Sequence, residues 1–591
     1  MGQQRNLIVA IVISVVILFG FQYLIAPRFS KPAPPPEQAQ TTTSTGTPSA
    51  PGTAPQAPAI VAPPTPVSRE ETLGKSPRLK IETPRLAGSI DLVGARIDDL
   101  TLTNYHEGVD PDSPLVQLLS PDGTPDPYFA DFGWVATGDS GVKVPDATTL
   151  WQTSGNTLSP GHPVTLSWDN GQGLRFVKQI AVDDNYMFTI AQTVESKSDK
   201  PVTLFPYGLI SRGGKTPTQS NRLLHVGPIG IIENTLKELS YSDLTAEKPI
   251  VEKTTGGWLG LTDEYWLAAL IPDQGEAVST RFAKVPRDKG DLYQADFTGS
   301  PHELAPGGTI TVNDRLFAGA KEVHLLDSYR DDQNVPRFDR AIDFGWFYFL
   351  TKPIFLVLDF FYRHIGNFGL AILLFTLCVK IIFFPLANRS YRSMSKMKLL
   401  QPEMAKLKER FGDDKAKLNQ EMMALYKRSG ANPAAGCLPI VIQIPVFFSL
   451  YKVLSVTIEM RHAPFYGWIH DLSVPDPTSV LNLFGLLPFA APADLPLIGF
   501  LSIGVWPIIM GLTMFLQQKL TPTSPDPMQA RMFLILPVVF TFMLAHFPAG
   551  LVIYWAWNNT LSVAQQWLIL RRAGAKPAPP PPAKAKAKAK A

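Results

Sequence analysis

The feature that most constrains this chain is an apolar stretch, residues 368–386, that carries one full positive charge. A helix of about 20 residues, at about 1.5 Å per residue, crosses the roughly 30 Å hydrocarbon core of a bilayer. The charge is Lys380, and the Thr376 hydroxyl lies one helical turn earlier on the same face. An intramembrane charge costs roughly 2.5–3.5 kcal/mol on insertion scales and usually marks a functional site. Two interpretations stay open: Lys380 occupies a buried polar cavity, or its side chain reaches back to the membrane surface.

The composition indicates a membrane protein rather than a large soluble one. Charged residues make up 18% of the chain and apolar residues 45%, and the apolar residues are concentrated in the C-terminal part. The net charge of +3 is too small to predict nucleic-acid binding, so we expect no DNA partner. Two cysteines, Cys378 and Cys437, are too few for a disulfide framework, and no metal site or cofactor is predicted.

The N-terminal residues predict a membrane anchor followed by a tether. Residues 7–25 are an apolar run behind Arg5, whereas the core of a signal peptide is usually about 7–15 residues. Residues 25–27 (Ile-Ala-Pro) form a poor cleavage site, so residues 1–26 are predicted as an uncleaved anchor, with a cleaved signal peptide as the alternative. The proline-rich residues 27–77 cannot bury a core, and they are predicted to be disordered.

Residues 78–340 have the texture of a β-sandwich. The runs 164–168 and 174–182 alternate apolar and polar residues, and they flank an Asp-Asn-Gly turn at 169–171 that favours a hairpin. Glycine, proline and aspartate breaks recur, and helical periodicity begins only near residues 324–340. The pattern predicts a large sandwich that closes with a short helix leading to the membrane.

The rest of the chain predicts a bundle of membrane helices. An aromatic amphipathic segment, 353–362, is predicted to lie in the headgroup region before the first of five core spans. These spans are residues 368–386, 437–455, 497–516, 532–547 and 551–570. Lys452 lies close enough to the end of its span to reach the surface. The 532–547 span is short and is predicted to thin the bilayer, and the turn at 547–550 predicts that the last two spans pair antiparallel.

A basic segment between the first two core spans, residues 388–433, predicts a helical hairpin with a break at 412–414. One face of the hairpin is apolar and rich in methionine; its candidate capture residues are Met394, Met397, Met404, Leu407 and Met422. Two interpretations stay open. The hairpin packs on itself, or its methionines form an adaptable surface for varied apolar partners.

The distribution of basic residues predicts the orientation in the membrane. The loop 458–496 contains one lysine or arginine, Arg461. Basic residues are instead concentrated in the hairpin, at Lys519 and Arg531, and in the tail 573–591. The positive-inside rule therefore places the sandwich and this loop outside and both chain termini in the cytoplasm. The lysine–alanine tail is interpreted either as a solubilising or lipid-surface segment or as an attractor of ribosomal RNA.

The predicted fold class is an α+β multidomain membrane protein: a periplasmic β-sandwich plus a polytopic helical bundle with five core spans after an N-terminal anchor helix. The predicted domains are the anchor 1–26, the linker 27–77, the sandwich 78–340, the interfacial helix and second span 341–387, the cytoplasmic hairpin 388–433, spans three to six 434–572, and the basic tail 573–591.

Several short motifs in residues 341–572 resemble the Oxa/YidC/Alb family of membrane protein insertases. They are FFPL at 383–386, QP at 401–402, QEMMALYK at 420–427, NP at 432–433, GCLP at 436–439, QIP at 443–445, WIHDL at 468–472, DPMQ at 526–529 and FPAGL at 547–551. The anchor and the large outer β domain resemble the family's Gram-negative form, whose domain is a supersandwich similar to sugar mutarotases. Gly256-Gly257-Trp258 and Tyr265 are weaker local similarities.

The resemblance implies a non-enzymatic insertase and chaperone of the bacterial inner membrane, with several partners. These are nascent membrane proteins, the Sec translocon (SecYEG and SecDF), the ribosome with the signal-recognition machinery, and the phospholipid bilayer. A transporter and a membrane-anchored carbohydrate enzyme are less favoured, because the sequence has neither internal repeats nor a convergent acid–base cluster.

The resemblance also implies a hydrophilic groove in the membrane. Its predicted lining residues are Lys380, Thr376, Gln443, Trp555 and Asn558. The rest of the polar half of the last span is also predicted to line it: Asn559, Thr560, Ser562, Gln565 and Gln566. Bacterial relatives usually carry arginine where this chain has Lys380. Lysine keeps the positive charge but lacks the planar fork that makes bidentate contacts.

Overall fold

The computed structural model describes residues 56, 67–214, 224–287, 290–412, 414–430, 438–487, 499–520 and 527–572. The predicted anchor, the tail, Cys437 and most of the predicted linker lie outside these residues. The end of the linker differs from the prediction, because it contains a short helix, α2 (Arg69–Leu73), rather than disordered chain. Ser68 caps this helix, and Arg69 forms an ion pair with Asp99 of the sandwich.

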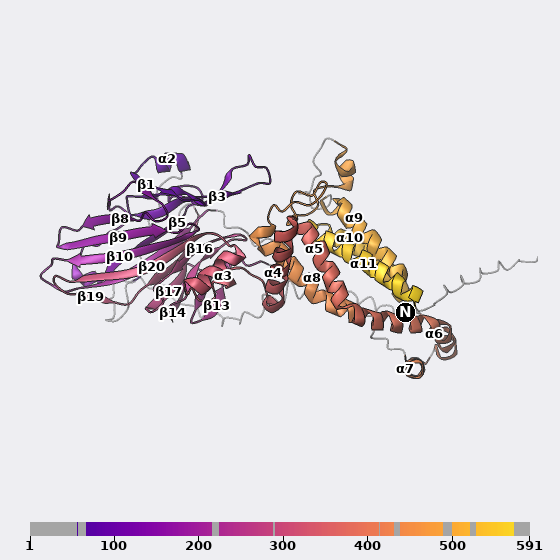
Figure 1. Ribbon diagram of the computed structural model, residues 1–591. Helices are drawn as coiled ribbons and strands as arrows, with labels where there is room; N and C mark the ends of the chain where they lie inside the picture. The colour runs from indigo at the N-terminus through magenta and orange to yellow at the C-terminus, as the bar shows by residue number, and fades with distance from the viewer. Residues whose placement is uncertain are drawn as a thin grey trace, which may run out of the picture. The chain divides into compact units, whose positions relative to one another are not determined.

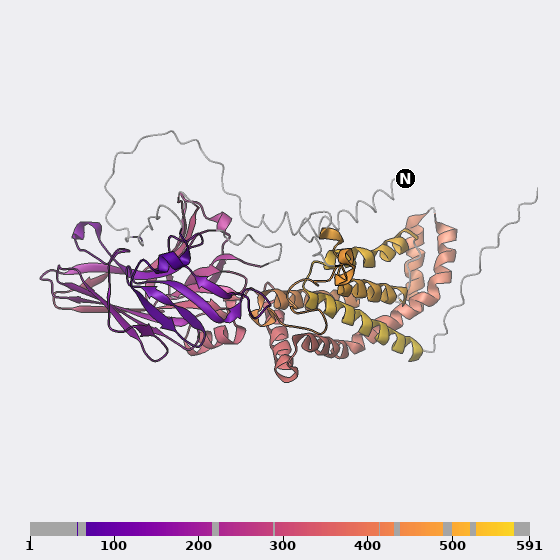
Figure 2. The same cartoon turned by 90° about the horizontal axis from the view of Figure 1, so that it is seen from above.

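The β domain consists of two sheets of mainly antiparallel strands, as predicted (Figures 1 and 2). The eleven-stranded sheet has the order β14-β17-β18-β11-β5-β3-β2-β1-β7, with β19 paired to β11 and β4 paired to β3. Its strands are β1 (Arg78–Glu82), β2 (Leu86–Asp91), β3 (Arg96–His106), β4 (Leu115–Leu119), β5 (Tyr128–Ala136), β7 (Thr157–Leu158), β11 (Val202–Arg212), β14 (Ile250–Thr255), β17 (Ala277–Val285), β18 (Leu292–Thr298) and β19 (His302–Leu304).

The nine-stranded sheet has the order β13-β12-β15-β16-β20-β10-β9-β8-β6. Its strands are β6 (Gln152–Thr153), β8 (Val164–Asp169), β9 (Leu174–Val182), β10 (Met187–Ser196), β12 (Gly227–Ile232), β13 (Thr235–Glu238), β15 (Trp258–Thr262), β16 (Trp266–Ile271) and β20 (Thr309–Ala320). Along β9 buried side chains alternate with more exposed ones, which is the pattern that places one face of a strand on a core.

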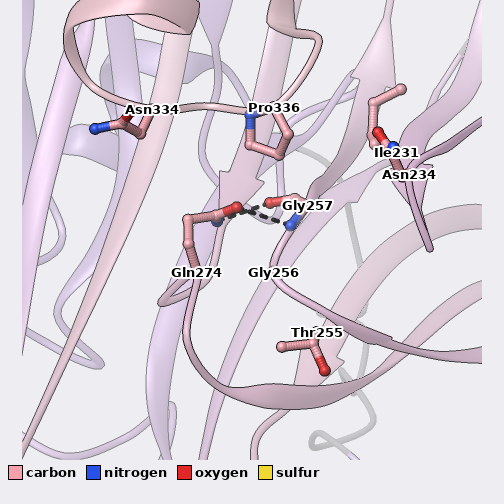
Figure 3. Close-up of a pocket in the computed structure, with 8 residues that line it drawn as sticks. All are labelled: Ile231, Asn234, Thr255, Gly256, Gly257, Gln274, Asn334 and Pro336. Atoms are coloured by element: carbon pink, nitrogen blue, oxygen red, sulfur yellow. Dashed lines mark hydrogen bonds between the residues drawn. The ribbon is translucent and has the colours of Figure 1, made fainter.

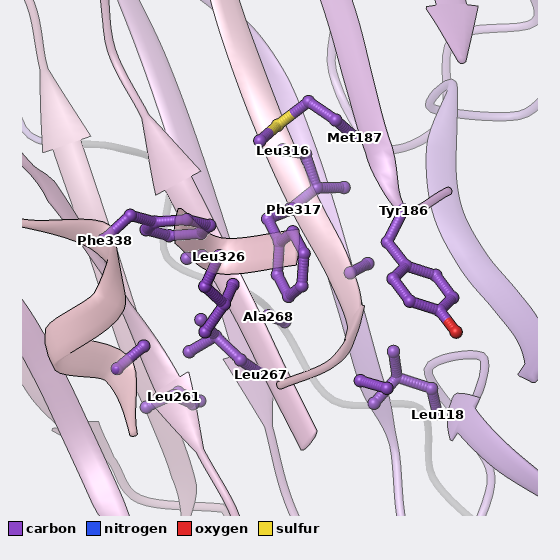
Figure 4. Close-up of a cluster of buried hydrophobic side chains, with 14 of the residues drawn as sticks. Leu118, Tyr186, Met187, Leu261, Leu267, Ala268, Leu316, Phe317, Leu326 and Phe338 are labelled. Carbon is purple, nitrogen blue, oxygen red and sulfur yellow. The ribbon is translucent and has the colours of Figure 1, made fainter. Parts of the chain in front are cut away.

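Large aromatic side chains fill one part of the core (Figure 4). Phe317 lies between Tyr186 and Phe338, with ring centroids 6.0 and 5.2 Å away, and all three rings are fully buried. Both contacts are edge-to-face, the arrangement that aromatic quadrupoles favour. Phe338 belongs to a short 3₁₀ helix, η5 (Phe338–Ala341), so the segment that leaves the sandwich is itself part of the core.

The turn between β8 and β9 confirms the predicted hairpin, and Asn170 is its structural centre. The Asn170 Oδ1 atom accepts hydrogen bonds from the backbone N–H groups of Gln172 and Leu174, at 2.8 and 3.0 Å. Its Nδ2 atom donates to the Lys143 carbonyl oxygen at 2.9 Å. One buried side chain therefore closes the turn and fixes the preceding loop.

We expect Asn170→Ala to destabilise the sandwich, because three buried or partly buried hydrogen bonds lose their side-chain partner. At about 0.5–1.5 kcal/mol per bond the loss is about 1.5–4.5 kcal/mol. Thermal unfolding of the full-length protein in detergent measures this as a lower Tm. The control is Asn156→Ala at an exposed position, which is expected to change stability by less than about 0.5 kcal/mol. Equal Tm values for the two variants would contradict the assignment.

The helix predicted to end the sandwich forms as two pieces, α3 (Val323–Asp332) and η5. Both are fixed to the sheets by polar contacts. The Tyr329 hydroxyl donates to Asp183 Oδ2 at 2.5 Å, and the Trp258 indole N–H donates to the Pro336 carbonyl oxygen at 3.1 Å. The segment that connects the sandwich to the membrane helices is therefore fixed to the sheets by hydrogen bonds.

In the described part of the chain, eight α-helices follow the sandwich (Figure 1). They are α4 (Tyr348–Ile365), α5 (Phe368–Ile382), α6 (Phe384–Phe411), α7 (Lys415–Ser429), α8 (Leu438–Val456), α9 (Val505–Leu520), α10 (Pro527–Leu544) and α11 (Ala549–Arg572). No single helix in the described residues is both long enough and apolar enough to cross a membrane. Residues 368–382 and 384–394 form a pair of helices bent by 65°, and only together are they long and apolar enough to do so among the described residues.

The stretch 368–386 is therefore not one straight helix, and this corrects the prediction. α5 ends at Ile382, and α6 begins at Phe384 with Pro385 in its first turn, a position where proline starts helices readily. The 15 residues of α5 are about 22 Å long, less than the hydrocarbon core. Lys380 thus lies in the last turn of α5 rather than deep within a continuous span.

The other helices differ from the predictions mainly at their ends. The predicted hairpin is confirmed, since α6 ends at Phe411 and α7 begins at Lys415. α10 starts at Pro527 and has 18 residues, so it is longer than the short span that was predicted. The turn at 547–550 reverses the chain, but α9 packs against both α10 and α11 and is the principal neighbour of each. The last two helices therefore do not form the simple pair that was expected.

Candidate functional site

Lys380 faces a neighbouring helix of the bundle. Its Nζ donates a hydrogen bond to the Ser562 Oγ on α11, 2.7 Å away. Ser562 is buried, and its hydroxyl in turn donates to the Asn558 carbonyl oxygen at 2.8 Å. Among the described residues, no carboxylate forms an ion pair with Lys380. The side chain is half-buried, so a cation stands at the α5–α11 contact with a hydroxyl as its partner.

Two other predicted groove residues lie beside this contact. Thr376 is buried one turn before Lys380, but its hydroxyl donates to the Ile372 carbonyl oxygen of its own helix at 2.6 Å. Asn558 is buried one turn before Ser562 on α11, so both lie on the same face of that helix. Thr376 and Asn558 therefore support the contact without bonding directly to Lys380 in the described hydrogen-bond network.

Gln443 joins a third helix to the same face of α11. Its Nε2 atom donates to the Tyr554 hydroxyl, and Tyr554 is buried one turn before Asn558. Tyr554, Asn558 and Ser562 are spaced by four residues, so they form one polar row along α11. The sequence analysis missed Tyr554 and included Ser562 only within the polar half of the last span, although this i, i+4, i+8 spacing was the signal that would have singled out both residues.

Trp555 is turned away from that row. Its ring packs against Phe447 of α8 and Phe540 of α10, with centroids 4.7 and 5.7 Å away. The structure therefore brings Lys380, Thr376, Gln443 and Asn558 to the junction of α5, α8 and α11, whereas Trp555 belongs to an adjacent aromatic cluster.

The polar half of the last span does not all face this junction, in contrast to the prediction. The Asn559 Nδ2 donates to Thr513 Oγ1 at 3.4 Å, and the Gln566 Nε2 donates to the Leu520 carbonyl oxygen at 2.9 Å. Both acceptors belong to α9. α11 thus carries two polar rows, one toward α5 and α8 and the other toward α9.

The methionines of the hairpin do not form one exposed surface. Met404 is buried at the contact with α7, where the Tyr426 hydroxyl approaches its sulfur at 3.8 Å. Met394 is buried against Ile569 of α11, and Met397 packs at the edge of that cluster. Leu407 and Met422 are half-buried.

The most exposed large apolar side chains of the hairpin are two that the sequence analysis did not select. Leu399 is 75% exposed and Met423 is 53% exposed. Met394 and Met404 therefore pack within the protein, whereas Leu399 and Met423 face outward, and the binding surface for apolar partners stays a prediction. Position along the helical face could not separate these two groups without the partner helices.

A polar seam joins the sandwich to the helices. On this seam Glu459, just after α8, accepts the Val323 N–H at the start of α3 at 2.8 Å. The residue that precedes α3, Glu322, does not cap the helix, because its carboxylate accepts from Arg85 and Tyr105 at 2.7 and 2.9 Å. Burial is the main cause that raises the pKa of Glu459 to about 7, and the nearby Glu322 carboxylate contributes to this rise.

Ion pairs extend the polar seam. Lys452 of α8 pairs with Asp343 at 2.8 Å, so it does not simply reach toward the membrane surface as predicted. Lys352 of α4 pairs with Asp327 of α3 at 2.5 Å, and the Arg461 guanidinium donates to the His106 carbonyl oxygen of β3 at 2.7 Å. The helix that carries Gln443 is thus fixed at its other end to the sandwich.

A separate cavity of about 300 Å³ opens at the edge of the sandwich (Figure 3). It is lined by Ile231, Asn234, Thr255, Gly256, Gly257, Gln274, Asn334 and Pro336. The Gln274 amide bonds to both backbone groups of Gly257, at 2.8 and 3.0 Å, as Figure 3 shows. The lining residues of this cavity contain no carboxylate, histidine or cysteine, so they do not provide an acid–base pair for hydrolysis.

Two family profiles together match most of the chain. A profile described as the YidC periplasmic domain matches residues 78–357, and one described as a 60Kd inner membrane protein matches residues 360–576. The chain is 52% identical to the membrane protein insertase YidC of Methylobacterium radiotolerans, over 98% of this chain and 96% of the relative. It is 51% identical to the protein of the same name from Bradyrhizobium diazoefficiens, over 98% and 97% of the two chains.

Solved structures give weaker similarities. A crystal structure of an active YidC insertase with its first transmembrane domain resolved matches with 18% identity and a TM-score of 0.35, over 82% of this chain and 91% of the other. A galactose mutarotase-like protein from Lactobacillus casei matches with 10% identity and a TM-score of 0.27, over 41% and 100%.

Proposed function

This chain belongs to the YidC family of membrane protein insertases, a family of inner-membrane proteins with a periplasmic domain, and from that premise we propose that a polar groove formed by α5, α8 and α11 is its insertion site. The observation that carries the proposal is the hydrogen bond between Lys380 and Ser562, which holds a cation without a carboxylate partner among the described residues. Gln443 and Tyr554 continue the polar contact between α8 and α11.

The groove would lower the free-energy cost of moving the polar segment of a substrate across the membrane. A nascent helix supplies its own driving force, because its apolar residues gain roughly 0.3–0.6 kcal/mol each on entering the membrane. The polar segment that must cross has no such gain, and a polar path with a fixed positive charge lowers the cost for acidic segments. We propose that Lys380 attracts that segment while its apolar part moves into lipid.

The other parts of the chain have supporting roles in this proposal. The exposed Leu399 and Met423 on the basic hairpin would contact apolar substrate segments and the ribosome on the cytoplasmic side. The sandwich would lie in the periplasm and contact the Sec translocon, with both chain termini in the cytoplasm. The polar seam supports a mechanical role for the sandwich, since it fixes the ends of α4 and α8.

The experiment that tests the proposal uses the purified full-length chain reconstituted as the sole protein in liposomes. A small membrane protein with one or two spans is synthesised in their presence, and the fraction protected from external protease is measured. We expect protected product well above that of protein-free liposomes. Equal protection in the two samples would overturn autonomous insertion, and a parallel sample with added Sec translocon measures any cooperation.

A further inference from the structure

Within the part of the chain that the structure describes, the Lys380 ammonium is incompletely coordinated. A lysine ammonium has three N–H donors, and the described network assigns one of them, to the Ser562 hydroxyl at 2.7 Å. A hydroxyl accepts a hydrogen bond without neutralising the charge, whereas a carboxylate at that position would form an ion pair and cancel it. The partner of Lys380 is therefore one that fixes the side chain and leaves its field intact.

Ser562 is well placed to hold the ammonium still. Its side chain is buried, and its own proton is committed to the Asn558 carbonyl oxygen at 2.8 Å, so its lone pairs face Lys380. Tyr391 of α6 is buried beside it, within the cluster that joins α6 to α11, and is a hydrogen-bonding neighbour of Ser562. One hydroxyl thus connects three helices at the groove.

We propose that Ser562 is a positioning residue for insertion: its hydroxyl holds the Lys380 ammonium at the α5–α11 contact so that the two remaining N–H groups receive an acidic residue of the translocating segment. The proposal rests on the proposed function and adds one selective element to it. Without the hydroxyl, the flexible lysine side chain is free to reach toward the nearby end of α5 and toward water. The groove would then keep its charge but lose its fixed position.

The test compares two substrates that differ only in the charge of the translocated tail, one with aspartates and one with the same positions changed to asparagine. With the full-length protein in liposomes, Ser562→Ala is expected to reduce insertion of the acidic substrate about 5-fold, the factor that corresponds to the net contribution of one typical hydrogen bond. Insertion of the neutral substrate is expected to change less than about 2-fold. Ser562→Thr keeps the hydroxyl and is expected to restore the acidic substrate.

Two further variants make the test specific. Ser562→Asp places a carboxylate against Lys380 and is expected to lower acidic-substrate insertion more than alanine does, because the ion pair cancels the field. Thr560→Ala is the matched control, since Thr560 makes the same type of bond to the carbonyl four residues earlier, at 2.8 Å, but is exposed and has no bond to Lys380. It is expected to insert both substrates as the unchanged protein does.

Each result decides the proposal. It is overturned if Ser562→Ala inserts the acidic substrate normally, or if that variant reduces both substrates equally, which would indicate a structural role. A Lys380→Ala sample in the same series separates the two levels of argument. If Lys380→Ala inserts normally, the groove charge itself is wrong; if it fails while Ser562→Ala is normal, only the positioning role is wrong.

Discussion

Replacing Lys380 with alanine is expected to reduce insertion of a substrate with an acidic translocated tail at least about tenfold. The change removes the cation at the α5–α11 contact and leaves the Ser562 hydroxyl without its donor. Losing an attraction of about 1.4 kcal/mol already corresponds to a factor of ten, and a partly desolvated ion pair exceeds that value. The measurement is protease-protected product in liposomes that contain this chain alone.

The matched variants are Lys380→Arg and Lys519→Ala. Arginine retains the positive charge and is expected to keep at least about half of the insertion, because the role of Lys380 needs a cation rather than a particular head group. Lys519 is an exposed lysine at the end of α9, over the Phe515 ring, and its loss is expected to have little effect. Normal insertion by Lys380→Ala would instead favour the interpretation that this side chain reaches toward the membrane surface.

The sequence predicted the secondary structure well where adjacent residues alone determine the backbone geometry. The hairpin of β8 and β9 follows from an Asp-Asn-Gly turn between alternating runs, and the α6–α7 break follows from a glycine and an aspartate cap. In both cases neighbouring residues alone decide the geometry.

The sequence was least informative where residues distant along the chain determine the contacts of a side chain. Lys452 is predicted to reach the surface because its own span is apolar, yet Asp343 pairs with it from the segment that leaves the sandwich. Met394 and Met404 look like members of one binding face, yet different helices bury them. Periodicity states which side of a helix is apolar, but it does not state which element covers that side.

In the candidate site, too, the sequence predicts which residues are polar but does not predict which helix each of them faces. Lys380, Thr376, Gln443 and Asn558 were predicted from the family resemblance and from their polarity within apolar stretches, and they do meet at one junction. Ser562 was counted only as part of a polar half of α11, because its significance depends on which of two polar rows faces α5. The assignment of Asn559 and Gln566 to the other row required the positions of α9.

The second large effect is expected at Glu459, where stability should fall as pH rises from about 5 to 7. The pKa of this carboxyl is raised to about 7 from an ordinary value of 4.5, because burial disfavours its ionised form. Between those values the folded protein holds a proton that the unfolded chain releases, so raising the pH favours unfolding. The penalty is complete above about pH 8 and amounts to about 3 kcal/mol. Thermal unfolding of the full-length protein from pH 5 to pH 8 measures it.

Two variants separate this titration from the other charges on the polar seam. Glu459→Gln keeps an oxygen for the Val323 N–H but cannot ionise, so its Tm is expected to lose the decline between pH 5 and 7 that Glu459 contributes. Glu459→Ala also leaves the first turn of α3 without its acceptor, and it is expected to be less stable than Glu459→Gln at every pH by about 1–2 kcal/mol. A Glu459→Gln curve parallel to that of the unchanged protein would show that Glu459 does not cause the pH dependence, and Glu459 would then act as a cap for α3 alone.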